Sequence, residues 1–354
     1  MKKHNFSAGP CILPKEVLLK ASEAVMDFNG SGLSLVEISH RSKDFVAVME
    51  NARSLALELL DLKDKGYKAL FLQGGASLEF LMVAYNLLEN KAGYLNTGTW
   101  SDKAIKEAKL FGDVVEVGSS KDENFKYIPK GYSIPSGLDY LHITSNNTIF
   151  GTQFKKFPKT DAPIVCDMSS DIFSRSLDFS QFDLIYAGAQ KNMGPAGTTL
   201  VVVKEDILGK VSRKIPSMLD YQVHISKDSM FNTPSVFAVY TSMLTLEWLK
   251  NMGGIAAIEE INEKKARLLY SEIDLNPIFK GYANAEDRSL MNATFNLTDE
   301  RLKSIFDSLL NEAGINGLNG HRSIGGYRAS MYNALSLDSV GVLVDVMSEM
   351  ERKG

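Results

Sequence analysis

The sequence predicts an α/β protein with a large domain on a mostly parallel β-sheet and a smaller α+β domain at the carboxyl end. Short apolar runs alternate with amphipathic segments along the first part of the chain, as in sheets covered by helices. Two of these runs, Leu184–Ala187 and Thr199–Val203, are joined by the short connection Ala189–Gly197, so any direct pairing between them is antiparallel. Beyond Asn251–Gly254 the composition changes, which indicates a second domain.

The chain length of 354 residues agrees with about two domains. We expect an N-terminal arm over residues 1–15 that packs with the small domain. A large domain follows over residues 16–253, and a small C-terminal domain covers residues 254–354.

The elements of the large domain are predicted from apolar periodicity and from the residues that interrupt it. Pro14 opens the first helix, and Asn29–Gly32 ends it. The further predicted helices are Lys43–Leu60, Leu78–Leu88, Lys103–Phe111 and Val236–Lys250. The predicted strands are Tyr67–Leu72, Gly93–Asn96, Val114–Val117, Tyr140–Thr144, Pro163–Cys166, Leu184–Ala187 and Thr199–Val203.

For the C-terminal part, the sequence predicts amphipathic helices that pack around a few strands. The predicted helices are Ile255–Tyr270, Asp299–Ala313 and Leu337–Arg352. Met291–Leu297 alternates like a strand, and a second strand carries Arg328.

Composition excludes several classes of protein. There are 39 basic and 43 acidic residues with no run of like charge, so nothing points to nucleic acid or to an anionic membrane. Two cysteines, Cys11 and Cys166, give neither a disulfide framework nor metal-ligand spacing. We see no signal-peptide core and no apolar stretch of about 20 residues that could span a membrane. We expect a cytoplasmic enzyme without a metal.

Lys191 is the first candidate for chemistry. It lies at a strand end, on a connection that also holds Gly194, Pro195 and Gly197. A lysine near apolar walls loses hydration, so its pKa falls and its amine can attack a carbonyl. A lone lysine in such a place is more often an ordinary solvated side chain, so further residues must support the functional interpretation.

The segment Gln73–Ser77 offers a phosphate site. It joins a predicted strand to a predicted helix, where free backbone N–H groups and the helix dipole attract an anion. Two adjacent glycines alone are a weak signal, because many such turns hold glycine for steric reasons. The absence of a G-x-G-x-x-G pattern and of a Walker A lysine disfavours dinucleotides and nucleoside triphosphates.

Three more residues fall at or near strand ends. Trp100 lies at a strand-to-helix corner and is either a packing residue or a flat surface for an aromatic ligand. Thr148 and Asp167 follow strands at the sheet edge where ligands of parallel sheets bind. Asp167 is either a turn cap or the partner of a pyridine nitrogen. Together with Lys191 and the glycine turn, they match the needs of pyridoxal phosphate.

The chain resembles the phosphoserine aminotransferases, which belong to the class V group of fold-type I pyridoxal-phosphate enzymes. The resemblance runs nearly end to end, and it implies a seven-stranded sheet with one antiparallel strand and a homodimer with shared active sites. The motifs that carry it are Asn5–Pro10, Glu37–Ser42, Gln73–Ser77, Ala189–Asn192, Phe231–Pro234 and Gly320–Arg322.

The resemblance assigns a cofactor role to several residues. Lys191 matches the Schiff-base lysine, Asp167 the pyridinium partner and Trp100 the stacking ring. Asn232 and Thr233 match a pair that reaches the phosphate from the neighbouring subunit. The full cofactor set is Ala76, Ser77, Trp100, Thr148, Asp167, Gln190, Lys191, Asn232 and Thr233.

The resemblance also assigns the substrate site. Arg328 matches the arginine that holds the α-carboxylate. His40 and Arg41, together with His321 and Arg322 from the other subunit, match the pocket for the distal anion. Arginine pairs bidentately with phosphate or carboxylate, so two His-Arg pairs are suited to this task.

Two departures from the family pattern stand out. Some members have arginine where this chain has Ser77, and some have serine where it has Ala8.

The function implied is reversible transfer of an amino group from L-glutamate to 3-phosphohydroxypyruvate, giving O-phospho-L-serine and 2-oxoglutarate in serine biosynthesis. Lys191 would act as general base and then as general acid. A related phosphorylated acid of pyridoxine biosynthesis, 3-hydroxy-2-oxo-4-phosphobutanoate, is a further candidate substrate.

Four alternatives stay open on the residues alone. An alanine- or serine-glyoxylate aminotransferase would share the cofactor site but not need four cationic groups at its distal end. A cysteine desulfurase needs a mobile cysteine near the small domain, and none follows Cys166. A non-catalytic relative would tend to lose Lys191 or Asp167. A nicotinamide-dependent dehydrogenase would need the missing glycine fingerprint.

Overall fold

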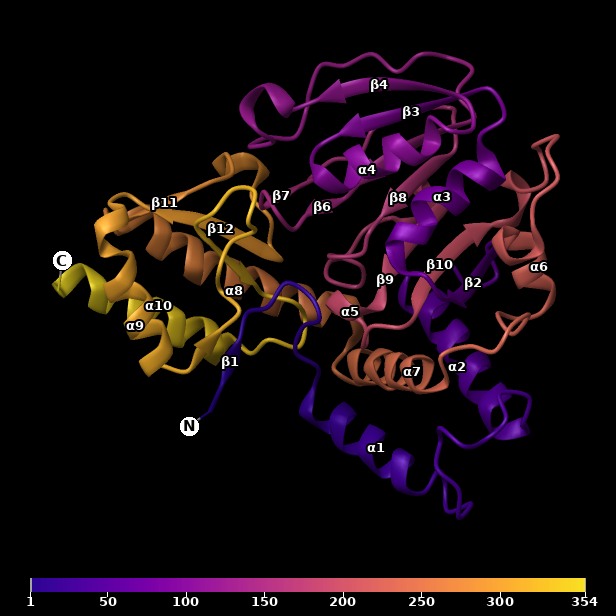
Figure 1. Cartoon of the computed structure of the whole chain (residues 1–354), viewed down its shortest axis with the longest axis horizontal. Coiled ribbons are helices and arrows are strands. Elements are labelled where there is room, and N and C mark those ends of the chain that lie inside the picture. Colours follow the sequence, from indigo (N-terminus) through magenta and orange to yellow (C-terminus); the bar gives the residue numbers. More distant parts are fainter. Residues whose placement is uncertain (1, 354) are drawn as a thin grey trace.

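The large sheet has seven strands in the spatial order β2-β10-β9-β8-β5-β3-β4 (Figure 1). The computed structural model describes residues 2–353. β10 runs antiparallel to both of its neighbours, and every other pair in this sheet is parallel. The strands are β2 (Tyr67–Leu72), β3 (Lys91–Asn96), β4 (Asp113–Ser119), β5 (Tyr140–Thr144), β8 (Ile164–Asp167), β9 (Leu184–Gly188) and β10 (Thr199–Lys204). The predicted fold class, with one antiparallel strand, is confirmed.

Helices cover both faces of this sheet. Along β9, Ile185 and Ala187 pack into the core beneath α1, α2 and α7, whereas Leu184 and Tyr186 pack beneath α3, α4 and α6. Because the strands are buried on both faces, their sequences are continuous apolar runs and do not alternate between apolar and polar residues. The helices are α1 (Lys15–Met26), α2 (Lys43–Leu59), α3 (Gly75–Leu87), α4 (Thr99–Ala108), α6 (Tyr221–Ser226) and α7 (Val236–Asn251).

A separate apolar core lies in the C-terminal part of the chain, drawn in orange and yellow in Figure 1. It is formed between the antiparallel sheet β11-β12-β14 and three helices. The elements are α8 (Gly254–Leu275), β11 (Phe279–Gly281), β12 (Asn292–Leu297), α9 (Lys303–Glu312), β14 (Tyr327–Ser330) and α10 (Leu337–Lys353).

The beginning of the chain crosses to this second core. Strand β1 (His4–Asn5) pairs in parallel with β13 (Ile315–Asn316), and Phe6 is fully buried among the C-terminal apolar side chains. Figure 1 shows this indigo segment beside the orange and yellow elements.

Several short elements were not predicted. α5 (Ala189–Asn192) lies between β9 and β10, where we expected a loop. The hairpin of β6 (Asn146–Asn147) and β7 (Thr152–Gln153) follows β5. The 3-10 turns are Lys121–Glu123, Phe179–Gln181, Glu205–Ile207, Ser217–Leu219, Ala285–Asp287 and Glu300–Leu302.

Two helices begin earlier than predicted. α3 begins at Gly75 and not at Leu78, because Gly74 adopts a left-handed conformation (φ 100°) that turns the chain directly into the helix. α4 begins at Thr99 and not at Lys103, so Trp100 lies within its first turn. None of the helices within residues 2–353 is long and apolar enough to cross a membrane.

Candidate active site

The candidate site lies at the carboxyl edge of the large sheet. Because the parallel strands end at one edge, the segments that follow them converge there. α3 follows β2, α4 follows β3, the β6–β7 hairpin follows β5, Asp167 ends β8, and α5 follows β9.

Lys191 lies in the single turn of α5 and points toward Trp100. Its Nζ is 5.3 Å from the centroid of the indole ring, and the residue is half-buried. Burial lowers the pKa of the Lys191 amine, Asp167 partly opposes this shift, and Arg328 lowers the pKa further. A fraction of neutral amine is therefore available to act as nucleophile or base.

Asp167 is buried at the end of β8. Its Oδ1 accepts a hydrogen bond of 2.9 Å from the backbone N–H of Ser169. Burial raises the pKa of the Asp167 carboxyl, while the charge of Lys191 and the Ser169 hydrogen bond act in the opposite direction. Since each of the two groups shifts the pKa of the other, the Asp167 carboxyl and the Lys191 amine lie close enough to interact electrostatically. No ion pair joins the two side chains within residues 2–353.

The turn before α3 is shaped as an anion cradle. A Cβ added to Gly74 would come within 2.4 Å of the Leu78 side chain, so the turn requires glycine. The first backbone N–H groups of α3, at Gly75, Ala76 and Ser77, have no partner inside the helix. Gln73 Nε2 donates to the Thr233 carbonyl at 2.8 Å and brings the Asn232–Thr233 segment of the same chain beside this turn.

Trp100 and Thr148 are joined directly. Trp100 Nε1 donates to Thr148 Oγ1 at 3.0 Å, which fixes the plane of the indole. Arg328, on β14, donates from Nη1 to the Thr148 carbonyl at 3.3 Å. Its Nε is buried and has no hydrogen-bond partner within the described chain. A buried guanidinium nitrogen without a partner is suited to a carboxylate ligand.

The two His-Arg pairs differ in their surroundings. Burial lowers the pKa of His321, and Arg328, Arg322 and Lys103 of the same chain lower it further, so His321 lies near its own Arg328. Proximity to Arg328 favours a role of His321 and Arg322 in their own chain, whereas the expectation that this pair serves the other subunit stays a prediction. No hydrogen bond or ion pair within residues 2–353 connects the side chains of His40 or Arg41 to the cofactor-site residues, and His40 Nε2 is buried without a partner.

The N-terminal arm takes part in the site in a way that sequence reasoning missed. The Cys11 N–H donates to the Gln190 carbonyl at 3.0 Å, and the Cys11 thiol donates to the Lys191 carbonyl. A Cβ on Gly9 would lie 3.5 Å from Lys191 Cγ. The Gly9-Pro10 turn is the only sequence signal that the arm bends here. A contact between Cys11 and Lys191, which are 180 residues apart, cannot be predicted from one sequence.

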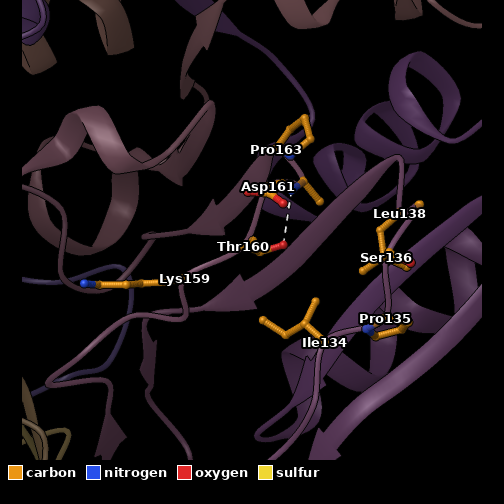
Figure 2. A pocket seen from close by; sticks show the side chains of 10 residues that line it. Ile134, Pro135, Ser136, Leu138, Lys159, Thr160, Asp161 and Pro163 are labelled. Carbon is orange, nitrogen blue, oxygen red and sulfur yellow. Dashed lines mark hydrogen bonds between the residues drawn. The ribbon is translucent and has the colours of Figure 1, made fainter.

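The chain also has cavities unrelated to this site. One of about 670 Å³ lies before β5 and β8, next to Leu138, Asp161 and Pro163 (Figure 2). It is at the amino edge of the sheet, opposite to the candidate site. The Lys159 side chain points away from the other labelled residues in Figure 2.

The residues at the carboxyl edge fit pyridoxal phosphate. The glycine cradle at the start of α3 suits the phosphate, and the indole of Trp100 suits the ring face. The buried carboxyl of Asp167 suits a protonated ring nitrogen, and the Lys191 amine suits the aldehyde.

Comparison with known proteins supports this fit. Residues 3–343 match the model of the class-V aminotransferase family. A phosphoserine aminotransferase of Flavobacterium psychrophilum is 70% identical over the full length of both chains. One of Bacteroides thetaiotaomicron is 55% identical, with 99% of each chain covered.

Solved structures give the same result. A phosphoserine aminotransferase studied for radiation damage of its Schiff base is 46% identical and superposes with a TM-score of 0.96, with both chains fully covered. The phosphoserine aminotransferase of Bacillus circulans is 42% identical with a TM-score of 0.96, and 99% of each chain is covered. An alanine–glyoxylate aminotransferase of Nostoc, at 15% identity and a TM-score of 0.75, shares the fold alone.

Proposed function

The chain belongs to the class-V aminotransferase family, and from that premise we propose that Lys191 binds the cofactor covalently and moves the proton during transamination. The protein is a pyridoxal-phosphate-dependent aminotransferase. It transfers an amino group from L-glutamate to 3-phosphohydroxypyruvate, which gives O-phospho-L-serine and 2-oxoglutarate for serine biosynthesis.

One observation carries the assignment of residues: the Lys191 amine lies 5.3 Å from the centroid of the Trp100 ring and within electrostatic range of the Asp167 carboxyl. Pyridoxal phosphate, when bound, supplies an aldehyde that condenses with amines and a protonated ring that accepts the electron pair of the α-carbon. The Lys191 amine removes the substrate α-proton and returns a proton to the former aldehyde carbon. Asp167 accepts a hydrogen bond from the ring nitrogen and holds its proton in place.

The remaining residues of the site bind and orient the substrate and the cofactor. Arg328 holds the α-carboxylate through its unpaired Nε and fixes the α-proton toward Lys191. The N–H groups of Ala76 and Ser77 bind the cofactor phosphate, and Gln190 lies one residue before the reactive lysine. Trp100 covers one ring face, and Thr148 contacts the hydroxyl side of the ring through the group that Trp100 orients.

We further propose a homodimer in which the two chains complete each other's sites. Asn232 and Thr233 would reach the phosphate of the partner chain, and His40 and Arg41 would enter its distal pocket. The buried and unpaired Nε2 of His40 supports this, because a buried polar nitrogen without a partner calls for a ligand or a second chain. His321 and Arg322 would act in their own chain.

The apolar cores support the proposed division into an arm (residues 1–15), a large domain (16–253) and a small domain (254–354), because two of them cover the faces of the large sheet and the third lies in the C-terminal part. We place the enzyme in the cytoplasm, in line with its biosynthetic reaction and its two free cysteines.

Visible absorbance tests the catalytic assignment. The purified protein should be yellow. L-glutamate should shift its visible band, and 3-phosphohydroxypyruvate should restore the band. Lys191→Ala should lose the borohydride-trapped adduct and about 10⁴-fold in turnover, because one group provides both the covalent link and the proton transfer.

Lys204→Ala, which removes a lysine at the end of β10, serves as the control and should behave like wild type. A colourless wild-type protein would refute the cofactor assignment. If the protein is yellow but 3-phosphohydroxypyruvate fails to restore the band that L-glutamate has shifted, only the assignment of the acceptor substrate is refuted.

A further inference from the structure

Asn192 is the last residue of α5 and lies directly after Lys191, and the catalytic mechanism gives its side chain no role. The side chain is buried, with 7% of the residue exposed. Its Nδ2 donates to the Ile172 carbonyl, and its Oδ1 accepts a hydrogen bond of 2.9 Å from the backbone N–H of Asn333. Both polar atoms of this amide are therefore used in contacts with segments distant in the sequence.

The two partners of Asn192 belong to opposite sides of the candidate site. Ile172 lies in the segment that follows β8, the strand that ends at Asp167. Asn333 lies in the segment that follows β14, the strand that carries Arg328. The Asn192 amide therefore ties α5 to the cofactor side and to the carboxylate-binding side of the site at once.

α5 needs such contacts to hold a fixed orientation. It has four residues, and a helix of one turn gains too little from its own hydrogen bonds to be stable alone. The direction in which Lys191 leaves the backbone is therefore set by the bonds between α5 and its neighbours.

A second layer of amides holds the partners of Asn192 in place. Asn333 Nδ2 donates to the Phe173 carbonyl at 2.9 Å. Asn262, on α8, donates from Nδ2 to the Ser174 carbonyl and to Asn333 Oδ1, both at 2.9 Å. Three consecutive carbonyls are thus bound by three buried asparagines from α5, from the segment after β14 and from α8.

The backbone of this turn shows that the contacts are needed. Phe173 adopts a left-handed conformation (φ 59°), which is unfavourable for a bulky residue and persists only where surrounding contacts impose it. The Phe173 carbonyl is the one that Asn333 binds. The asparagines therefore hold a strained turn directly beside the bond that orients α5.

We propose that Asn192 is a positioning residue that holds the Lys191 amine in place for proton transfer, through its bonds to Ile172 and Asn333. The inference rests on the proposed function, because it concerns the lysine of that reaction. A group displaced by about 1 Å can lose about 10²-fold in rate while substrate binding is retained. Loss of the Asn192 amide should therefore slow the chemical step and not weaken binding.

The test compares Asn192→Ala with the matched control Asn86→Ala. Asn86 is a buried asparagine near the end of α3 that lies away from the phosphate turn. It uses the same two contacts: Nδ2 donates to the Leu219 carbonyl at 2.7 Å, and Oδ1 accepts from the Tyr221 N–H at 3.1 Å. Both variants should unfold at a lower urea concentration than wild type. Only Asn192→Ala should lower kcat, by about thirtyfold, with both KM values changed by less than about threefold.

Two further measurements report on the Lys191 amine itself. The kinetic isotope effect with α-deuterated L-glutamate should be larger for Asn192→Ala than for wild type, because proton transfer becomes slower relative to the other steps. Cofactor-free Asn192→Ala should take up pyridoxal phosphate more slowly than wild type, as followed by the growth of the visible band. Its final band and its borohydride-trapped adduct at Lys191 should match wild type. Asn86→Ala should match wild type in all of these measurements.

Asn333→Ala keeps the test possible if Asn192→Ala does not fold. It retains the backbone N–H that binds Asn192 and loses the amide that binds the Phe173 carbonyl, so kcat should fall by about three- to fivefold with the same change of isotope effect.

The proposal is wrong if Asn192→Ala keeps the kcat and isotope effect of Asn86→Ala, or if it raises KM with kcat unchanged. Should Asn192→Ala fail to fold, wild-type kcat and isotope effect in Asn333→Ala would overturn the proposal. A wild-type protein that takes up no pyridoxal phosphate would instead refute the proposed function.

Discussion

At the scale of single residues, environment decides which ionisable groups can do chemistry. Lys191 and Asp167 are both shifted toward their neutral forms by burial, and each partly restores the charge of the other. The sequence predicted both residues from their positions at strand ends. It could not predict the contacts of Cys11 with Gln190 and Lys191, because Cys11 lies in no recognisable motif and only the folded chain brings these residues together.

Glu79 is a buried carboxyl that the catalytic mechanism does not use. It lies on α3 and is fully buried, and Tyr221 donates a hydrogen bond of 2.6 Å to its Oε2. Its Oε1 has no partner within the described chain. Burial raises the pKa of Glu79 to about 7, and the Tyr221 hydrogen bond offsets only part of this shift.

Glu79→Gln should therefore change the pH dependence of stability. The folded protein keeps the Glu79 proton up to about pH 7, whereas the unfolded chain loses it near its ordinary value. Stability thus falls as pH rises between these values, and the penalty stays constant above pH 7. Glutamine keeps the acceptor for Tyr221 without the penalty. The variant should be more stable than wild type at pH 8 by at most about 3 kcal/mol, and much less so at pH 4.

Urea unfolding at pH 4 and pH 8 measures this difference. Glu50→Gln, an exposed glutamate on α2, is the matched control and should show no change with pH. If Glu79→Gln differed from wild type by the same amount at both pH values, Glu79 would not be the titrating group.

At the scale of elements, the β6–β7 hairpin links the large sheet to the C-terminal sheet. The sequence placed Thr148 just after a strand, and the structure shows that a buried hairpin bonded to β12 surrounds this position. Asn146 Nδ2 donates to Asn292 Oδ1 at 2.8 Å, and Asn292 Nδ2 donates to Ser330 Oγ at 3.0 Å. Asn146 lies two residues before Thr148, and Ser330 lies two residues after Arg328. The hydrogen-bonded series Asn146–Asn292–Ser330 therefore fixes the position of Arg328, which binds the carboxylate, relative to the cofactor site.

Asn292→Ala should weaken substrate binding without loss of the cofactor. Every substrate carries an α-carboxylate, so KM should rise about three- to tenfold for L-glutamate and for 3-phosphohydroxypyruvate alike. Unpaired buried groups at Asn146 and Ser330 should also lower the free energy of unfolding by about 1–3 kcal/mol. Steady-state kinetics and urea unfolding measure the two effects, and the visible band should not change.

Thr298→Ala is the control, because it removes hydrogen bonds at the far end of β12, to the carbonyls of Pro277 and Ile278. It should lower stability and leave both KM values unchanged. If Asn292→Ala behaved in the same way, the amide chain would be only structural.

Elements differ in how well sequence predicts them. The long strands and helices carry many apolar residues at regular spacing, so their existence and order follow from the pattern. α5 has four residues and the hairpin strands have two each, too few for any period to appear. Their structure comes from tertiary contacts, and α3 begins early because of the conformation of Gly74, not because of periodicity.

At the scale of the whole molecule, the open question is which chain supplies each cation of the distal pocket. One sequence cannot distinguish a residue that acts in its own chain from one that acts in a partner. The structure brings His321 near Arg328 of the same chain, and His40 Nε2 has no hydrogen-bond partner among the described residues. We therefore expect a dimer in which Arg41 crosses to the other site and Arg322 does not.

Hybrid dimers test this division. A dimer purified from co-expressed Lys191→Ala and Arg41→Ala chains, each with its own tag, would hold one site with Lys191 from one chain and Arg41 from the other. That site is intact, so the hybrid should show about half of wild-type activity, although each parent homodimer is impaired. The matched hybrid of Lys191→Ala with Arg322→Ala should have no intact site, because the only functional lysine would then share its chain with the missing arginine. If the second hybrid were active and the first inactive, the two His-Arg pairs would have to be exchanged between the chains. A monomer by sedimentation would remove the shared site altogether.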